Sequence, residues 1–200
     1  MSHYFETPET TARTRTIRAS IWGQDHGFTT AGGVFSGPRL DPGTAVLFRE
    51  TTPPSAGGRL LDLGCGFGPI AVALATECPT AVVDAVDVNE LALELTRTNA
   101  RAAGVDERVR TGTPDQVLAT DPRYDQIWSN PPIRIGKAAL HELLLTWLPR
   151  LRPDGEAWLV VSKNLGADSL QQWLQEQGWP TERTASAKGF RVLRVSARQT

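Results

Sequence analysis

The chain has 200 residues with a formal net charge of −1, and 40% of its residues are hydrophobic. This composition is typical of one α/β domain with a full core, and it excludes the strongly basic class of nucleic-acid-binding proteins, so any RNA contact must come from local clusters of charge. The chain has no apolar run of about 18 residues and its N-terminus has no apolar core of a signal peptide, so we expect a cytoplasmic protein without membrane contact. The two cysteines, Cys65 and Cys78, and the three histidines are scattered, and we expect neither a disulfide framework nor a metal site.

The beginning of the chain predicts a β-hairpin. Residues 13–22 alternate between apolar and polar side chains, with Ile17, Ala19 and Ile21 on one face, as in a half-buried strand. After a glycine-containing turn, residues 28–30 can return as the partner strand.

A short helical stretch that ends at Glu50 follows a glycine-rich loop. The Pro- and Gly-rich break at residues 53–58 separates this part from the rest of the chain. We therefore predict an N-terminal extension at residues 1–57, which packs on the main domain at residues 58–200 and partly closes over it.

The rest of the chain alternates between strand and helix patterns, which indicates a parallel sheet. The predicted strands are apolar runs at residues 60–63, 81–86, 109–111, 124–129 and 156–162. The predicted helices have an apolar stripe or a Pro start, and they cover residues 69–77, 89–103, 140–151 and 169–177. Residues 112–122 read as a polar connection, and residues 181–187 and 190–197 as a closing hairpin. The predicted fold class is α/β: a Rossmann-like, mostly parallel sheet of seven strands with a closing antiparallel hairpin.

The most informative stretch is the glycine-rich sequence at residues 60–70, LLDLGCGFGPI. It leads from a strand through Gly64, Gly66 and Gly68 into a helix that opens with Pro69. Glycines allow positive φ angles and close approach of a ligand to the main chain, and free N–H groups at a helix N-terminus favour an anionic group. The stretch therefore predicts a nucleotide-binding turn.

The spacing of this turn narrows the choice of nucleotide. A dinucleotide fingerprint would need Gly or Ala at position 69, and a P-loop would need Gly-Lys-Ser/Thr, neither of which is present. Asp87 ends the second strand, where a carboxylate can accept both hydroxyls of a ribose. Cys65 has no histidine patterned beside it, so we interpret it as a small buried loop residue and not as a nucleophile.

The segment Asn130-Pro131-Pro132-Ile133 follows the fourth predicted strand. Ligands of open parallel sheets bind at the carboxyl ends of the strands, so this segment should lie beside the glycine turn. The lone pair of an exocyclic amino group is delocalised, and two acceptors, the Asn130 side-chain oxygen and the Pro131 carbonyl, can hold both hydrogens and turn the lone pair outward. The alternative is an ordinary turn, because Asn-Pro is a common turn signal.

Taken together, these motifs resemble the small-domain methyltransferase superfamily and are most similar to the bacterial 16S ribosomal RNA guanine-N2 methyltransferases and their single-domain relatives. The matching motifs, in order, are His3-Tyr4-Phe5, Gly33-Val34-Phe35-Ser36, residues 61–66, Asp87-Val88-Asn89, and residues 130–134 with Gly136-Lys137. The resemblance implies methyl transfer from S-adenosylmethionine to an amino group, most simply guanine N2 in 16S ribosomal RNA, without a metal.

The resemblance and the predicted sheet together give a set of site residues. The residues expected to bind the cofactor are Asp62, Gly64, Cys65, Gly66, Gly68, Asp87, Val88 and Asn130, with Asp115 as the candidate contact to adenine. The residues expected to hold the target amino group are Asn130, Pro131, Pro132 and Ile133. Many such enzymes have an aromatic residue where this chain has Ile133, so we expect either weaker stacking on the base or stacking by Phe35. The expected phosphate-binding rim consists of Arg134, Lys137, Lys163 and Lys188.

The substrate is less constrained than the chemistry. We expect ribosomal RNA or the small ribosomal subunit as partner, and a monomer or homodimer. Two alternatives remain: an N-methyltransferase that acts on a protein glutamine or a small molecule, and a non-catalytic RNA-binding module that has kept the fold.

Overall fold

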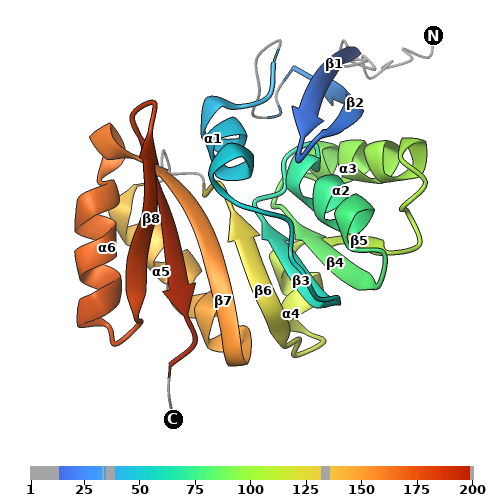
Figure 1. Ribbon diagram of the computed structural model, residues 1–200. Coiled ribbons are helices and arrows are strands. Elements are labelled where there is room, and N and C mark those ends of the chain that lie inside the picture. The colour runs from blue at the N-terminus through green and yellow to red at the C-terminus, as the bar shows by residue number, and fades with distance from the viewer. Residues whose placement is uncertain (1–13, 33, 35–38, 132–135, 199–200) are drawn as a thin grey trace, which may run out of the picture.

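The structure of the chain, a computed structural model, describes residues 14–32, 34, 39–131 and 136–198. Its centre is a seven-stranded sheet of order β5-β4-β3-β6-β7-β9-β8 (Figure 1). The strands are β3 (Gly58–Leu63), β4 (Ala81–Val86), β5 (Val109–Gly112), β6 (Tyr124–Ser129), β7 (Leu151–Ser162), β8 (Thr181–Ala187) and β9 (Phe190–Ser196). The pairs formed by β3 to β7 are parallel, and β9 is antiparallel to both of its neighbours. The predicted sheet with its closing hairpin is therefore confirmed, and β3 and β6 are neighbours.

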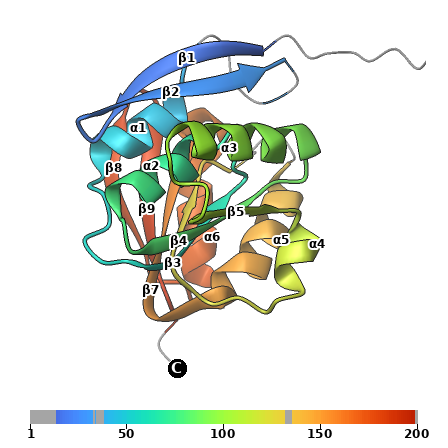
Figure 2. The same cartoon turned by 90° about the vertical axis from the view of Figure 1, so that its right-hand side faces the viewer.

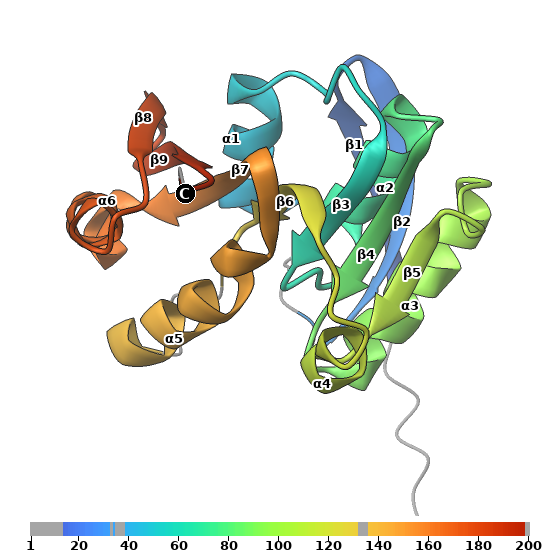
Figure 3. The same ribbon diagram turned by 90° about the horizontal axis from the view of Figure 1, so that it is seen from below.

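Helices cover both faces of this sheet (Figure 3). One face carries α1 (Pro42–Glu50), α2 (Pro69–Glu77) and α3 (Glu90–Ala102), and the other carries α4 (Pro114–Leu118), α5 (Lys137–Trp147) and α6 (Ala167–Glu176). None of the helices in the described ranges combines the length and the apolar character needed to cross a membrane.

The strand pleat divides the core into two clusters, one on each face of the sheet. Leu60 and Val160 belong to the cluster under α1, α2 and α3, whereas their neighbours Leu61 and Val161 belong to the cluster under α5 and α6. Consecutive apolar residues can all be buried because successive side chains point to opposite faces, which explains why the central strands read as continuous apolar runs. Each fully buried side chain of this size contributes about 1.5–3 kcal/mol.

The N-terminal hairpin lies over the helices of the first face (Figure 2). It consists of β1 (Thr14–Ile21) and β2 (Gln24–Ala31), paired antiparallel from Thr14↔Ala31 to Ile21↔Gln24. Ile17, Ile21 and Phe28 are buried and belong to the same cluster as α1, α2 and α3. The hairpin thus packs on the helices of this face through its own apolar face, and the division of the chain at residue 57 stays a prediction.

Asn99 on α3 joins the hairpin to the glycine turn. Its side chain is 1% exposed. The amide oxygen accepts from the Thr29 backbone N–H at 2.7 Å, and the amide nitrogen donates to the Thr29 carbonyl at 2.9 Å and the Phe67 carbonyl at 2.7 Å. The Asn99 side chain therefore connects the turn that follows β3 to strand β2 of the hairpin.

Replacing Asn99 by alanine is expected to lower the free energy of unfolding by about 2–4 kcal/mol, because buried backbone groups lose their partners. Urea unfolding of the wild type and the variant measures this difference. Thr98→Ala is the matched control on the exposed side of the same helix, and its effect should stay within about 0.5 kcal/mol. Equal effects of the two substitutions would contradict the bridging role of Asn99.

Two predicted boundaries and one predicted connection differ most from the structure. The helix expected to reach residue 151 ends at Trp147, and a 3₁₀ turn, η2 (Leu148–Arg150), follows, because Pro149 has no N–H to continue the helix. Strand β7 starts at Leu151 and not at residue 156, since Leu151 already pairs with Tyr124 of β6. The register shifts before Glu156 pairs with Gln126, and Asp154 in between has φ of 65°. The stretch at residues 112–122 contains α4, whose Thr113 and Gln116 form a capping box.

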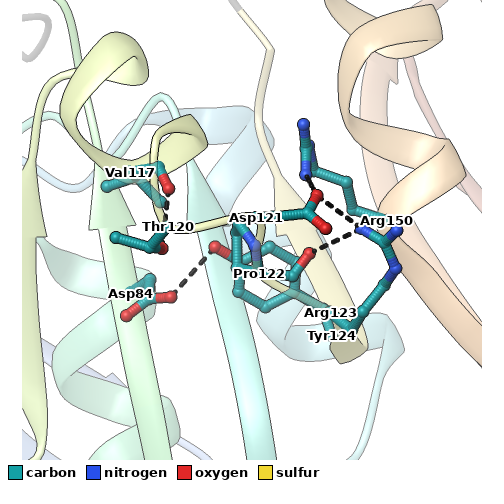
Figure 4. A network of polar contacts seen from close by, with 8 residues as sticks. All are labelled: Asp84, Val117, Thr120, Asp121, Pro122, Arg123, Tyr124 and Arg150. Atoms are coloured by element: carbon teal, nitrogen blue, oxygen red, sulfur yellow. Dashed lines mark hydrogen bonds and ion pairs between the residues drawn. The ribbon is translucent and has the colours of Figure 1, made fainter.

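A polar network fixes the edge of the sheet at which β6 begins (Figure 4). The hydroxyl of Tyr124 reaches from β6 past β3 and donates to Asp84 on β4 at 2.9 Å, and Arg59 on β3 pairs with the same carboxylate at 2.7 Å. Burial, together with the charge of Asp84, raises the pKa of Tyr124, so this hydroxyl stays a donor. The network holds in register the three strands whose opposite, carboxyl ends carry the motifs described above.

Candidate functional site

A cavity of about 560 Å³ opens at the carboxyl ends of the central strands. Its walls come from the loop after β3, the ends of β4, β6 and β7, the start of β9, and the first turn of α1. A volume of this size suits a nucleoside or a molecule of similar size. In open parallel sheets, ligands bind where the strand order reverses. Here the order reverses at β3, because β4 and β5 lie on one side of it and β6 and β7 on the other, and the cavity lies at this point.

The glycine turn forms one wall of the cavity. Gly64, Gly66 and Gly68 have φ angles of 78°, 57° and 84°, which a residue with a side chain rarely adopts. Gly64 and Cys65 donate their N–H groups to the carbonyl of Val86 at 2.8 and 3.0 Å, so the turn is tied to the end of β4. Gly68 caps α2, with Pro69 at its first position as predicted.

Asp87 lies where β4 ends and lines the same cavity. One of its oxygens accepts from the Gly66 N–H at 2.9 Å, and the other accepts from the Asn89 N–H at 3.0 Å. Each oxygen keeps a further lone pair, so the carboxylate can accept two hydroxyl groups while it remains fixed by the backbone. Val88, beside it, is 81% exposed and offers an apolar surface at the rim.

Asp62 is placed behind the glycine turn, not in the wall of the cavity. It is fully buried, its Oδ2 accepts from the Ala71 N–H at 2.9 Å, and its Oδ1 has no hydrogen-bond partner among the described residues. Burial, with a smaller contribution from the charge of Asp87, raises the pKa of Asp62 to about 8. An acid in this setting is held neutral at pH 7 and responds to any positive charge brought near it.

Cys65 lines the cavity as a buried thiol. Its sulfur lies 3.5 Å from the Thr96 hydroxyl. Burial raises its pKa well above the usual value of a thiol, which disfavours the reactive thiolate. This environment supports the interpretation of Cys65 as a packing residue of the turn.

Asn130 and Pro131, after β6, form the opposite wall. The Nδ2 of Asn130 donates to Asp41 Oδ1 at 2.6 Å and to Thr44 Oγ1 at 3.0 Å. Both amide hydrogens are therefore used by the start of α1, and the amide oxygen receives no hydrogen bond among the described residues. The arrangement presents an acceptor at the cavity.

The predicted site residues fall into three groups. The structure brings Gly64, Cys65, Gly66, Asp87, Val88, Asn130 and Pro131 together around one cavity. Asp62, Gly68, Asp115, Lys137, Lys163 and Lys188 do not line it: the first two support the turn, and the other four lie outside its walls. Phe35, Pro132, Ile133 and Arg134 lie outside the described residues.

Several lining residues were not predicted from the sequence. They include Asp41, Thr44, Leu143, Ser162, Leu165 and Phe190. Asp41 was recognisable only as the start of a helix, and Phe190 only as the start of a strand. Phe190 supplies an aromatic ring within the described part of the cavity, beside Gly43, where an added Cβ atom would lie 3.0 Å from the ring.

Comparison with known proteins gives consistent matches. The methyltransferase small domain family matches residues 25–194. The protein YbxB of Bacillus subtilis (strain 168) is 31% identical over 96% of this chain and 96% of its own length. Ribosomal RNA small subunit methyltransferase C of Hahella chejuensis is 34% identical over 82% of this chain and 47% of its own length.

Among solved structures, the T. thermophilus 16S rRNA N2 G1207 methyltransferase (RsmC), in complex with AdoMet and guanosine, matches with a TM-score of 0.81 and 25% identity. The match covers 96% of this chain and 52% of that chain. This chain therefore spans about half the length of these ribosomal RNA methyltransferases, and nearly the full length of YbxB.

Proposed function

The chain belongs to the methyltransferase small domain family, and we propose that it transfers a methyl group from S-adenosylmethionine to guanine N2 in 16S ribosomal RNA. The observation that carries the proposal is the Asn130 carboxamide, which is oriented by α1 and faces the glycine turn across one cavity. The names of the relatives support the reaction class and the ribosomal substrate.

The residues of the cavity fit S-adenosylmethionine. Asp87 can accept the ribose hydroxyls and Val88 can pack on the adenine, while the exposed side of the glycine turn is open: a Cβ atom at Gly66 would meet no protein atom within 4 Å. Asp115 lies next to Pro114, which lines the cavity, and remains our candidate for the adenine amino group. When bound, S-adenosylmethionine supplies an electrophilic methyl group on a positively charged sulfur and leaves as a neutral thioether.

The residues of the other wall would act on the target amino group. The Asn130 oxygen and the Pro131 carbonyl accept one hydrogen each, and they hold the nitrogen with its lone pair aimed at the methyl group. As the N–C bond forms, the nitrogen becomes positive, and the same two acceptors stabilise its hydrogens more strongly. The surplus proton then leaves to water, so no strongly basic side chain is needed.

Basic side chains at the edge of the cavity support a nucleic-acid substrate. The Lys163 N–H donates to the Gly189 carbonyl at 2.8 Å, which brings the segments of Lys163 and Lys188 side by side. Both side chains are exposed, and neither forms an ion pair with another described residue. They can bind phosphates of an RNA strand, while a guanine that is unpaired enters the cavity.

The proposal is tested by methyl transfer from labelled S-adenosylmethionine to 16S ribosomal RNA, to small ribosomal subunits and to a protein extract, in parallel. We expect label in RNA that digests to N2-methylguanosine. Label in protein would replace the ribosomal proposal with the glutamine alternative. Binding of S-adenosylmethionine without transfer to any of the three would favour a small-molecule substrate or the non-catalytic module.

Two neighbouring glycines should respond differently to alanine. In Gly66→Ala the added methyl group would point into open space and meet no protein atom, so the loss of stability should be limited to about 1–2 kcal/mol of backbone strain. The same methyl group would occupy space on the open side of the turn, so S-adenosylmethionine binding should weaken at least tenfold. Gly68→Ala is expected to lower the free energy of unfolding by about 3 kcal/mol, because its Cβ atom would lie 2.7 Å from a Thr96 methyl group. Calorimetry and thermal unfolding separate the two effects, and equal losses of stability in both variants would count against this division.

A further inference from the structure

We infer that Asp41 is a positioning residue, which turns the Asn130 carboxamide so that its oxygen, and not its nitrogen, faces the cavity. Asp41 has no role in the motifs from which the site was predicted. The inference rests on the proposed transfer to an amino group, and it explains why the site accepts an N–H donor.

The first argument is the geometry of the contact. The Asp41 Oδ1 caps α1, since it accepts from the Gly43 N–H at 2.8 Å and the Thr44 N–H at 3.2 Å, and it also accepts from Asn130 Nδ2 at 2.6 Å. Figure 1 shows the start of α1 beside the end of β6, although the two residues lie 89 positions apart. The same carboxylate oxygen thus caps α1 and binds the side chain of Asn130.

The second argument is the chemistry of the acceptor. An ionised carboxylate has no hydrogen to donate, so it pairs only with the nitrogen end of an amide. A turned amide would place its oxygen 2.6 Å from the carboxylate oxygen, where the two partial negative charges repel each other. Thr44, which is 4% exposed, accepts the second hydrogen at 3.0 Å.

The third argument is the space around the contact. A Cβ atom at Gly43 would lie 3.0 Å from Asp41 Oδ1 and 3.3 Å from Asn130 Nδ2. The start of α1 therefore approaches the amide so closely that a side chain at position 43 would require Asp41 or Asn130 to shift. The consequence is an acceptor oxygen with a fixed direction, which favours a substrate amino group over a carbonyl group.

The test compares two substitutions that both preserve the helix cap. Serine caps helices as well as aspartate does, but its shorter side chain cannot reach Asn130. In Asp41→Ser we expect kcat for methyl transfer to fall at least 30-fold, while the Kd for S-adenosylmethionine changes less than threefold and Tm falls by no more than a few degrees. Asp41→Asn keeps an oxygen at the same place but can also present its nitrogen, so its kcat should fall less than tenfold.

A spectroscopic measurement tests the same orientation without any substrate. The side-chain NH₂ signal of Asn130 is assigned by its absence from the spectrum of Asn130→Ala. In the wild type its hydrogens should exchange slowly with water, and in Asp41→Ser at least tenfold faster, whereas the surface control Asp106→Ser should leave the exchange rate unchanged.

The two measurements separate two kinds of failure. If the wild type transfers no methyl group to RNA, the proposed function fails, and the exchange rates alone decide the role of Asp41. Equal exchange rates in the wild type and Asp41→Ser would overturn the inference. So would a loss of kcat in Asp41→Ser that merely follows a loss of folded protein.

Discussion

Replacing Asn130 by alanine is expected to lower the rate of methyl transfer by at least about 10³-fold and to leave the Kd for S-adenosylmethionine within a few-fold of the wild type. The side chain supplies one of the two acceptors that hold the target amino group, and losing a preorganised hydrogen bond to the transition state costs about 10²–10³ in kcat. Misplacement of the nitrogen adds to this loss. Single-turnover transfer to the best substrate and calorimetry with S-adenosylmethionine measure the two quantities separately.

Two further variants make this result specific. Asn130→Asp has the same shape, but it brings a second carboxylate to within 2.6 Å of Asp41, so it should be as inactive as the alanine variant. Gln172→Ala removes an exposed amide on α6 that lies outside the cavity and should transfer normally. If Asn130→Ala lost cofactor binding and transfer together, Asn130 would belong to the cofactor site and not to the amino group.

The parts of the fold that could be predicted are those with local signals. The alternation of Ile17, Ala19 and Ile21 predicted β1, and the glycine turn with Pro69 predicted the start of α2 to the residue. Asp87 and Asn130 could be assigned to one edge because parallel strands end on the same side.

The parts that could not be predicted depend on contacts between distant segments. Asp41 contacts Asn130 only when α1 packs beside the end of β6, and no sequence pattern in either segment predicts this contact. The end of α5 at Trp147 was missed because Leu148 and Leu151 continue the apolar spacing into a 3₁₀ turn and a strand. The burial of Asp62 behind the turn, and not in the cavity, likewise depends on how α2 closes over β3.

Asp62→Asn is expected to make the protein without ligand more stable above pH 7 and to make its free energy of unfolding depend less on pH. The pKa of Asp62 is about 8 in the folded protein and near 4 in an unfolded chain. Below pH 4 the acid is neutral in both states. As the pH rises from 4 to 8, the unfolded state releases its proton and the folded state does not, so the free energy of unfolding falls across this window. Asparagine has no such proton. Between pH 5 and pH 8 the wild type should therefore lose about 3–4 kcal/mol of unfolding free energy relative to the variant, and the Tm advantage of the variant should grow by roughly 10 °C.

The same substitution should remove a pH dependence of cofactor binding. S-adenosylmethionine carries an ammonium group, and a positive charge near Asp62 favours the ionised acid, so binding releases a proton and the affinity of the wild type should rise between pH 6 and pH 7.5. In Asp62→Asn the affinity should be about tenfold lower at pH 7.5 and nearly independent of pH. Asp106→Asn, which removes an exposed carboxylate, should follow the wild type. If the affinities of the wild type and Asp62→Asn changed in parallel with pH, Asp62 would only hold the start of α2 through the Ala71 N–H, and the charge that meets the ammonium group would have to come from another residue.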